Sequence, residues 1–216
     1  MSIKLENISK MYQTPQKKVE VLRNLNLEIK DKEMMVIFGP SGIGKTTLLN
    51  IIGAIDVPTS GKIFIDGADL SGLKADELAN LRKEKIGFIF QSFNLLPNLT
   101  AIDNIILPVL LDTGRAKKIE NIYSFASEIG MKDRLTHLPK ELSSGEQQRI
   151  AIMRAMINSP SIIFADEPTA DLDDVNAKKI IDILKGLNQK RGCTVVIATN
   201  DEQTAGNFPK RFNLKL

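Results

Sequence analysis

Residues 34–52 read MMVIFGPSGIGKTTLLNII, and this stretch decides the fold. Its first five residues are apolar, as in a strand of a parallel sheet that is covered on both faces. The next eight fit the pattern GxxxxGKS/T, a glycine-rich loop that leads into a helix. Glycines let backbone N–H groups close around a phosphate, and the lysine adds a positive charge. The stretch therefore predicts a strand, a phosphate-binding loop and a helix in this order.

We expect this loop to bind ATP and Mg²⁺. Lys45 can supply a point charge to the β- and γ-phosphate oxygens, and the Thr46 hydroxyl suits Mg²⁺. The predicted nucleotide contacts of the loop are Gly39, Pro40, Ser41, Gly42, Ile43, Gly44, Lys45, Thr46 and Thr47. The alternative, a glycine-rich turn with an exposed lysine, leaves the apolar strand before the loop unexplained.

The other segments place this loop in an α/β fold. Segments 161–165 and 194–198 are apolar and rich in β-branched residues, and 86–90 suits a further strand. Alternating apolar residues in 3–5 and 25–29 predict half-buried strands of an antiparallel layer. The pattern turns helical between 92 and 160. Strands that alternate with helices predict a doubly wound sheet with its ligand at the carboxyl ends of the strands.

Two acidic residues follow the apolar strand at 161–165. Asp166 and Glu167 should lie at the same sheet edge as the phosphate loop, where Asp166 can hold Mg²⁺ and Glu167 can polarise the attacking water. Taken alone, such a pair is more often a solvated turn. Together with the loop, it favours nucleotide hydrolysis.

The composition is that of an ordinary globular protein. The 216 residues are 43% hydrophobic and 25% charged, which suits one domain. A net charge of +3 gives no reason to expect nucleic-acid binding. The N-terminus lacks a signal peptide, and the most apolar later stretch, 105–111, is too short to cross a bilayer, so we expect a cytoplasmic protein. The lone Cys193 is expected to be a buried apolar residue.

A third motif, LSSGEQQR at 142–149, opens a predicted helix. Ser143 and Glu146 have the spacing of a capping box, which alone would explain them. The segment also resembles the LSGGQ signature of ATP-binding cassette ATPases, and its distance from the other two motifs fits that family. The resemblance covers essentially the whole chain.

The resemblance implies further site residues. Tyr12 matches the aromatic residue that stacks on adenine, and Gln91 matches the glutamine that senses both Mg²⁺ and the transporter subunit. Residues 170–173 match the loop that contacts the opposite subunit. The segments at 51–67 and 86–105 look like the branch that serves lipoprotein release, macrolide export and antimicrobial-peptide resistance, along with the cell-division cassette.

Two positions depart from the family pattern. Ser144 stands where the family usually has glycine, so its Cβ either crowds the phosphate or demands an unfavourable backbone angle, unless its hydroxyl donates to the phosphate. Asn200 stands where the family usually has a histidine that contacts the γ-phosphate. The one histidine, His137, is expected to be a solvated loop residue.

We therefore expect a P-loop NTPase with a RecA-like parallel core sheet, an antiparallel β subdomain and a helical subdomain. Residues 1–91 and 158–216 would form the core of a single nucleotide-binding domain, and 92–157 the helical subdomain. No regulatory domain is expected after the last strand, FNLKL.

By this resemblance, two copies would close around two Mg-ATP and drive an integral-membrane permease from the inner face of the cell membrane. Each site would join Lys45 and Asp166 of one copy to Ser143, Ser144, Gly145 and Glu146 of the other, with Glu167, Gln91 and Asn200 as catalytic residues. One alternative is a regulatory clamp that hydrolyses ATP slowly or not at all. A second alternative, a P-loop kinase, leaves LSSGEQQR unexplained.

Overall fold

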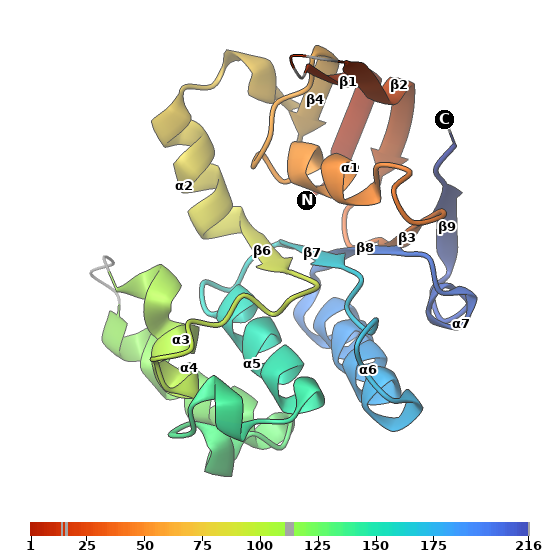
Figure 1. Cartoon of the computed structure of the whole chain (residues 1–216). Helices are drawn as coiled ribbons and strands as arrows, with labels where there is room; N and C mark the ends of the chain where they lie inside the picture. Colours follow the sequence, from red (N-terminus) through yellow and green to blue (C-terminus); the bar gives the residue numbers. More distant parts are fainter. Residues whose placement is uncertain (14, 16, 111–114, 216) are drawn as a thin grey trace.

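A parallel five-stranded sheet lies at the centre of the computed structural model, which describes residues 1–13, 15, 17–110 and 115–215 (Figure 1). The strand order is β6-β7-β8-β3-β9. The strands are β6 (Ile86–Ile89), β7 (Ile162–Asp166), β8 (Thr194–Thr199), β3 (Met34–Phe38) and β9 (Lys210–Asn213). The expected α/β fold with a parallel core sheet is confirmed. The last strand begins two residues before FNLKL, because Lys210 pairs with Met35.

Successive residues of the central strands point into two hydrophobic cores. In β3, Met35 and Ile37 join one cluster, whereas Met34 and Val36 join the other. Side chains alternate between the two faces of a strand, so a strand covered on both sides must be apolar throughout. This is why 34–38 reads as an uninterrupted apolar run.

The first core lies beneath an antiparallel layer with the order β2-β1-β4-β5. Its strands are β1 (Ile3–Gln13), β2 (Lys18–Ile29), β4 (Ser60–Ile65) and β5 (Ala68–Asp69). Helix α1 (Lys45–Ile52) lies between this layer and the parallel sheet, and buries Leu48, Leu49, Ile51 and Ile52 (Figure 1). The antiparallel layer predicted from alternating residues is confirmed.

The second core joins the opposite face of the sheet to the helical part of the chain. Its helices include α3 (Ala101–Ile106), α4 (Arg115–Glu128), α5 (Ser144–Met156) and α6 (Asp174–Arg191). Ile105 of α3 and Met153 of α5 belong to the same cluster as Ile163 of β7. The helices therefore share a core with the sheet instead of forming one of their own.

Two further helices and four 3-10 turns complete the described structure. Helix α2 (Ala75–Lys85) precedes β6, and α7 (Glu202–Ala205) precedes β9. The 3-10 turns are Leu70–Gly72, Leu107–Val109, Lys132–Arg134 and Pro139–Glu141. Within the described ranges, every helix is too short or too polar to cross a membrane. Cys193 is buried, as expected, and its burial raises the pKa of the thiol.

Candidate functional site

The phosphate loop connects β3 to α1, as predicted. Gly42 and Gly44 have φ angles of 78° and 107°, a region that side chains other than glycine rarely adopt. A Cβ on Gly44 would also lie 2.7 Å from Cγ1 of Val21. Two glycines of the loop, one of them in the pattern, therefore have a backbone conformation that favours glycine.

Lys45 is held inside this loop. Its Nζ donates to the carbonyl oxygens of Gly39 at 2.9 Å and Pro40 at 3.2 Å, and lies 3.2 Å from Oε1 of Glu167. The Lys45 side chain is only 6% exposed. The ammonium group is thus fixed at the site by the loop and by an acidic residue, and charged hydrogen bonds of this kind are strong.

Asp166 ends β7 next to the loop. Its Oδ2 accepts a 2.6 Å hydrogen bond from the Thr46 hydroxyl, while its Oδ1 is buried and has no hydrogen-bond partner among the described residues. Burial raises the pKa of Asp166, and the hydrogen bond from Thr46 offsets this only in part. A buried carboxylate oxygen without a partner, beside a hydroxyl, fits a hard cation such as Mg²⁺.

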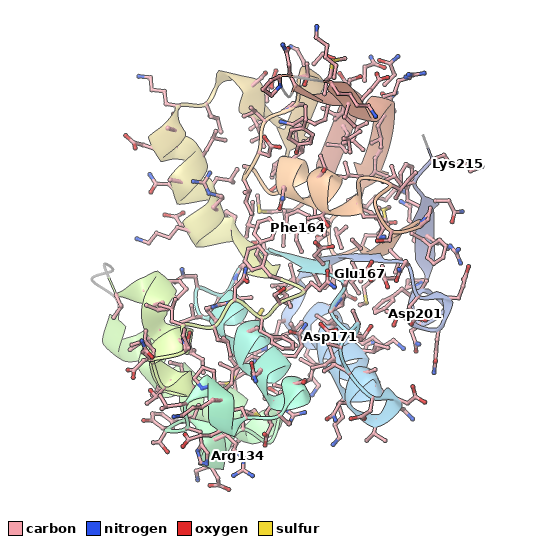
Figure 2. All side chains as sticks on the ribbon, in the orientation of Figure 1. Arg134, Phe164, Glu167, Asp171, Asp201 and Lys215 are labelled. Atoms are coloured by element: carbon pink, nitrogen blue, oxygen red, sulfur yellow. The ribbon has the colours of Figure 1, made fainter. Side chains whose placement is uncertain are left out.

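Glu167 follows at the carboxyl edge of the sheet, near the centre of the molecule (Figure 2). Its φ of 43° is unusual for a residue with a side chain. The backbone N–H donates to the carbonyl oxygen of Ala198 at 2.8 Å, which fixes this conformation. Strained backbone held by its surroundings is common at functional sites.

The neighbouring strands bring two more predicted residues to this edge. Asn200 follows β8, and its backbone N–H donates to Oε2 of Glu167 at 3.3 Å, while its side chain is exposed. Gln91 lies two residues beyond Ile89, which pairs with Ala165 in the adjacent strand. The strand register thus places Gln91 near the level of Glu167.

Tyr12 lies near the carboxyl end of β1 and is 41% exposed as a residue. Its hydroxyl donates to Oδ2 of Asp56 at 2.8 Å, and Nζ of Lys10 lies 4.8 Å from the ring centre. The side chain of Thr47, which follows Lys45 and Thr46 in the motif, lies close to the Tyr12 hydroxyl. The predicted adenine contact is therefore adjacent to the predicted phosphate contacts.

The signature segment begins α5 with the predicted capping box. The Ser143 hydroxyl accepts from the N–H of Glu146, and a Glu146 carboxylate oxygen accepts from the N–H of Ser143. A Cβ on Gly145 would lie 2.7 Å from Asn176, so this glycine is required for packing against α6. Ser144 is the first residue of α5 and has no positive φ. The concern about its backbone angle was wrong, and its side chain is exposed.

The signature segment and the phosphate loop lie apart within one copy. Glu146 binds Arg134 at 2.8 Å, and Arg134 lies at the far end of the helical part from Glu167 (Figure 2). In the described part of the chain, no hydrogen bond joins Ser143 or Glu146 to the phosphate loop. Asp171, from the loop predicted to meet the opposite subunit, is exposed on the helical side of Glu167 (Figure 2).

His137 is half-buried, although the sequence led us to expect a solvated residue. Its backbone carbonyl accepts from the N–H of Ala101 at 2.8 Å, so the loop packs against the start of α3. Its Nδ1 is buried and has no hydrogen-bond partner among the described residues.

The sequence did not reveal Arg154 of α5. Its guanidinium donates to the carbonyl oxygens of Asn94 at 2.5 Å and Phe93 at 2.6 Å, just after Gln91. Both loop residues have positive φ angles. Arg154 therefore links the signature helix to the loop that carries Gln91. The acceptors are backbone atoms, which leave no signal in the sequence.

Comparisons with known proteins place the chain in a family. A family model described as ABC transporter matches residues 22–170. MJ0796 of Methanocaldococcus jannaschii, named an uncharacterized ABC transporter ATP-binding protein, is 45% identical over 94% of this chain and 88% of its own length. A solved structure described as a dimeric post-hydrolysis state of MJ0796 bound to ADP and Pi has a TM-score of 0.88 at 42% identity. It covers 99% of this chain and 94% of that one.

Two further relatives carry names of transport systems. The lipoprotein-releasing system ATP-binding protein LolD of Syntrophus aciditrophicus is 39% identical over 99% of this chain and 96% of its own length. The macrolide export ATP-binding/permease protein MacB of Vibrio parahaemolyticus is 42% identical over 97% of this chain but 32% of its own length. Both names fall in the predicted lipoprotein-release and macrolide-export branch. The chain belongs to the ABC transporter family, as one of its ATP-binding proteins.

Proposed function

We propose that this chain binds and hydrolyses ATP and that two copies use this reaction to drive a membrane permease. The observation that carries the proposal is the convergence of Lys45, Thr46, Asp166 and Glu167 at one edge of the parallel sheet. These four residues come from two segments 120 positions apart and supply a cation, a hydroxyl and two carboxylates. Phosphoryl transfer to water needs this set.

Each residue of the site has a proposed role in ATP binding or hydrolysis that follows from its position. The N–H groups of the loop and the Lys45 ammonium hold the β- and γ-phosphates. Glu167 accepts a hydrogen bond from the attacking water and so makes it a better nucleophile. The exposed face of Tyr12 stacks on the adenine, and Asn200 and Gln91 orient groups around the γ-phosphate.

Thr46 and Asp166 would hold Mg²⁺. The ion would neutralise charge that develops on the transferred phosphate. No group of three or more ionisable ligands lies in the described ranges, so phosphate oxygens and waters would complete its shell.

The complete site requires a second copy. Ser143, Ser144, Gly145 and Glu146 lie apart from the phosphate loop of their own chain, so they would contact ATP held by the partner. The dimeric MJ0796 structure bound to ADP and Pi supports this arrangement. With both signature segments engaged, two ATP molecules would lie between the copies.

The membrane partner is proposed from the relatives. LolD is named for a lipoprotein-releasing system, and MacB is named as both ATP-binding and permease protein. These names favour a transport ATPase at the inner face of the membrane over a non-hydrolysing clamp, and the post-hydrolysis title of the MJ0796 structure points the same way.

Replacement of Lys45 tests the proposal. Lys45→Ala should abolish MgATP binding or turnover and leave the fold intact, since it removes the main positive charge on the phosphates. Lys62→Ala is the control, because Lys62 is 60% exposed and pairs with Asp69 in the antiparallel layer. Calorimetric binding and ATPase assays would measure both. Normal ATP affinity and turnover in Lys45→Ala would overturn the site.

A further inference from the structure

Tyr12, the proposed adenine contact, belongs to a small polar cluster whose other members have no role in the proposed reaction. The cluster consists of Lys10 and Tyr12 on β1 and Asp56 in the loop after α1, which is 44 positions from Tyr12 along the chain. Lys10 and Tyr12 are two positions apart on one strand, so they lie on the same face. Asp56 links both to the segment that follows the phosphate-loop helix.

Asp56 accepts hydrogen bonds at both carboxylate oxygens. Its Oδ1 accepts from Nζ of Lys10 and from the N–H of Val57, each at 2.7 Å, and its Oδ2 accepts from the Tyr12 hydroxyl. Burial raises the pKa of Asp56, but these hydrogen bonds outweigh it and hold the pKa below its usual value. The carboxylate is therefore charged at neutral pH and binds the hydroxyl strongly.

Lys10 covers the inner side of the Tyr12 ring. Lys10 is 8% exposed, and its Nζ lies 4.8 Å from the ring centre and also donates to the carbonyl oxygen of Val57 at 2.7 Å. Tyr12 itself is 41% exposed. The buried cation therefore occupies one side of the ring and leaves another side open to solvent.

We infer that Lys10 and Asp56 are positioning residues that fix the Tyr12 ring as a platform for the purine base of the nucleotide. An unanchored tyrosine on an exposed strand end would sample several rotamers and lose that freedom on binding. Here the hydroxyl is held by Asp56, and the cation over one ring face fixes the ring's tilt. The inference rests on the proposed contact between Tyr12 and adenine.

A positioning role and a purely structural role of the cluster predict different effects on the binding of a ligand that has phosphates but no base. The cluster would matter for a ligand that carries a base and would not matter for inorganic triphosphate, which has only the phosphates. If Asp56 instead served only to shape α1 and its loop, its replacement would weaken the binding of ATP and of triphosphate equally. The two ligands thus separate the two roles.

The test compares Asp56→Asn and Tyr12→Phe with wild type. An asparagine offers one side-chain acceptor to three donors, and phenylalanine keeps the ring but loses the anchoring hydroxyl. Asp69→Asn is the matched control, since Asp69 pairs with Lys62 and accepts from the N–H of Ser71 in the same antiparallel layer. The measurements are KM and kcat for ATP, and calorimetric Kd values for ATP and inorganic triphosphate.

We expect Asp56→Asn and Tyr12→Phe each to raise the KM and Kd for ATP about threefold to tenfold, the effect of one lost hydrogen bond. The kcat and the Kd for triphosphate should stay at the wild-type values, and the double variant should lose no more than the larger single loss. Equal weakening of ATP and triphosphate, or unchanged ATP binding in Tyr12→Phe, would overturn the positioning role.

Tyr12→Ala separates this inference from the proposed function. It should weaken ATP about tenfold or more by loss of stacking. If Tyr12→Ala weakens ATP while Asp56→Asn and Tyr12→Phe do not, only the positioning role fails. If Tyr12→Ala binds ATP normally, the adenine contact itself is wrong and the positioning role falls with it.

Discussion

Lys45 and Glu167 form an ion pair inside the proposed ATP site, with 3.2 Å between Nζ and Oε1 and side chains that are 6% and 13% exposed. The lysine that should bind the phosphates is thus held by the acid that should activate water. We expect ATP to draw the ammonium of Lys45 away from this acid and so to free Glu167 for the attacking water. The binding of ATP would then be coupled to the release of the base.

Glu167→Gln should give a stable ATP-bound dimer and lower turnover by about 10²–10⁴-fold. The amide cannot act as a base, while the phosphate contacts of Lys45 persist. Gel filtration with MgATP measures the dimer. Glu84→Gln on the exposed surface of α2 is the control. A Glu167→Gln chain that stays monomeric at all ATP concentrations would count against closure around the nucleotide.

Asp166→Asn should stabilise the ligand-free protein at neutral pH while it weakens MgATP binding. The pKa of Asp166 is raised by burial, so the folded state keeps its proton to a higher pH than the unfolded state. Wild-type stability therefore falls as pH rises from about 4 through the raised folded pKa, and the asparagine variant escapes this loss.

Urea unfolding of wild type and Asp166→Asn, measured at several pH values from about 5 to about 8, would show the effect. The urea concentration at the unfolding midpoint should be higher for Asp166→Asn than for wild type, and this difference should grow with pH. A difference that is constant, or that favours wild type at high pH, would contradict the desolvation of Asp166.

Asn200→His should raise ATP turnover about tenfold or more. The asparagine amide is shorter than an imidazole, so we expect its donor to lie farther from the γ-phosphate than the far ring nitrogen of a histidine, which would add a contact made mainly in the transition state. The backbone of Asn200 already binds Glu167, so the new ring would extend from a fixed point beside the base. ATP binding should change much less.

Steady-state ATPase assays would compare Asn200→His with Asn207→His, a control outside the strand ends, with the membrane partner present. An equal or lower kcat in the Asn200 variant would show that asparagine already serves the γ-phosphate.

Arg154→Lys should loosen the loop after Gln91. Arginine donates to two carbonyl oxygens at once through a planar fork, and lysine cannot reproduce this geometry. We expect faster amide exchange over residues 92–96 and a loss of about 1–3 kcal/mol in the free energy of unfolding. Arg82→Lys is the matched control, because Arg82 binds the carbonyl oxygen of Ala54 in another loop. Unchanged exchange over 92–96 in Arg154→Lys would show that the loop is held by other contacts.

The features that the sequence predicted correctly are those encoded by residues close together in the chain. The apolar run at 34–38, the glycines after it and the box of Ser143 and Glu146 are all contained within a few residues, and the structure has each of these elements where it was predicted. Helix α2 was missed for a physical reason. It buries no residue fully, and only Leu78 and Leu81 pack against the core, so ADELANLRKEK carries a weak apolar stripe.

The contacts that the sequence could not show join distant positions. Asp56 meets Lys10 across 46 positions, and Arg154 meets the carbonyl oxygen of Asn94 across 60. Neither contact has a fixed spacing, and a backbone acceptor can belong to any residue. The positive φ of Glu167 was equally hidden, because the hydrogen bond from its N–H reaches Ala198 on another strand.

Mixing two inactive variants tests the central claim, that each ATP site is built from two copies. Lys45→Ala destroys the phosphate loop of its own chain, and Ser143→Arg destroys the signature segment. A dimer with one of each holds one site with both defects and one site with neither. The account predicts that the mixture hydrolyses ATP although each variant alone does not. A mixture as inactive as its components, with mixed dimers demonstrated by differently tagged chains, would contradict a site shared between copies.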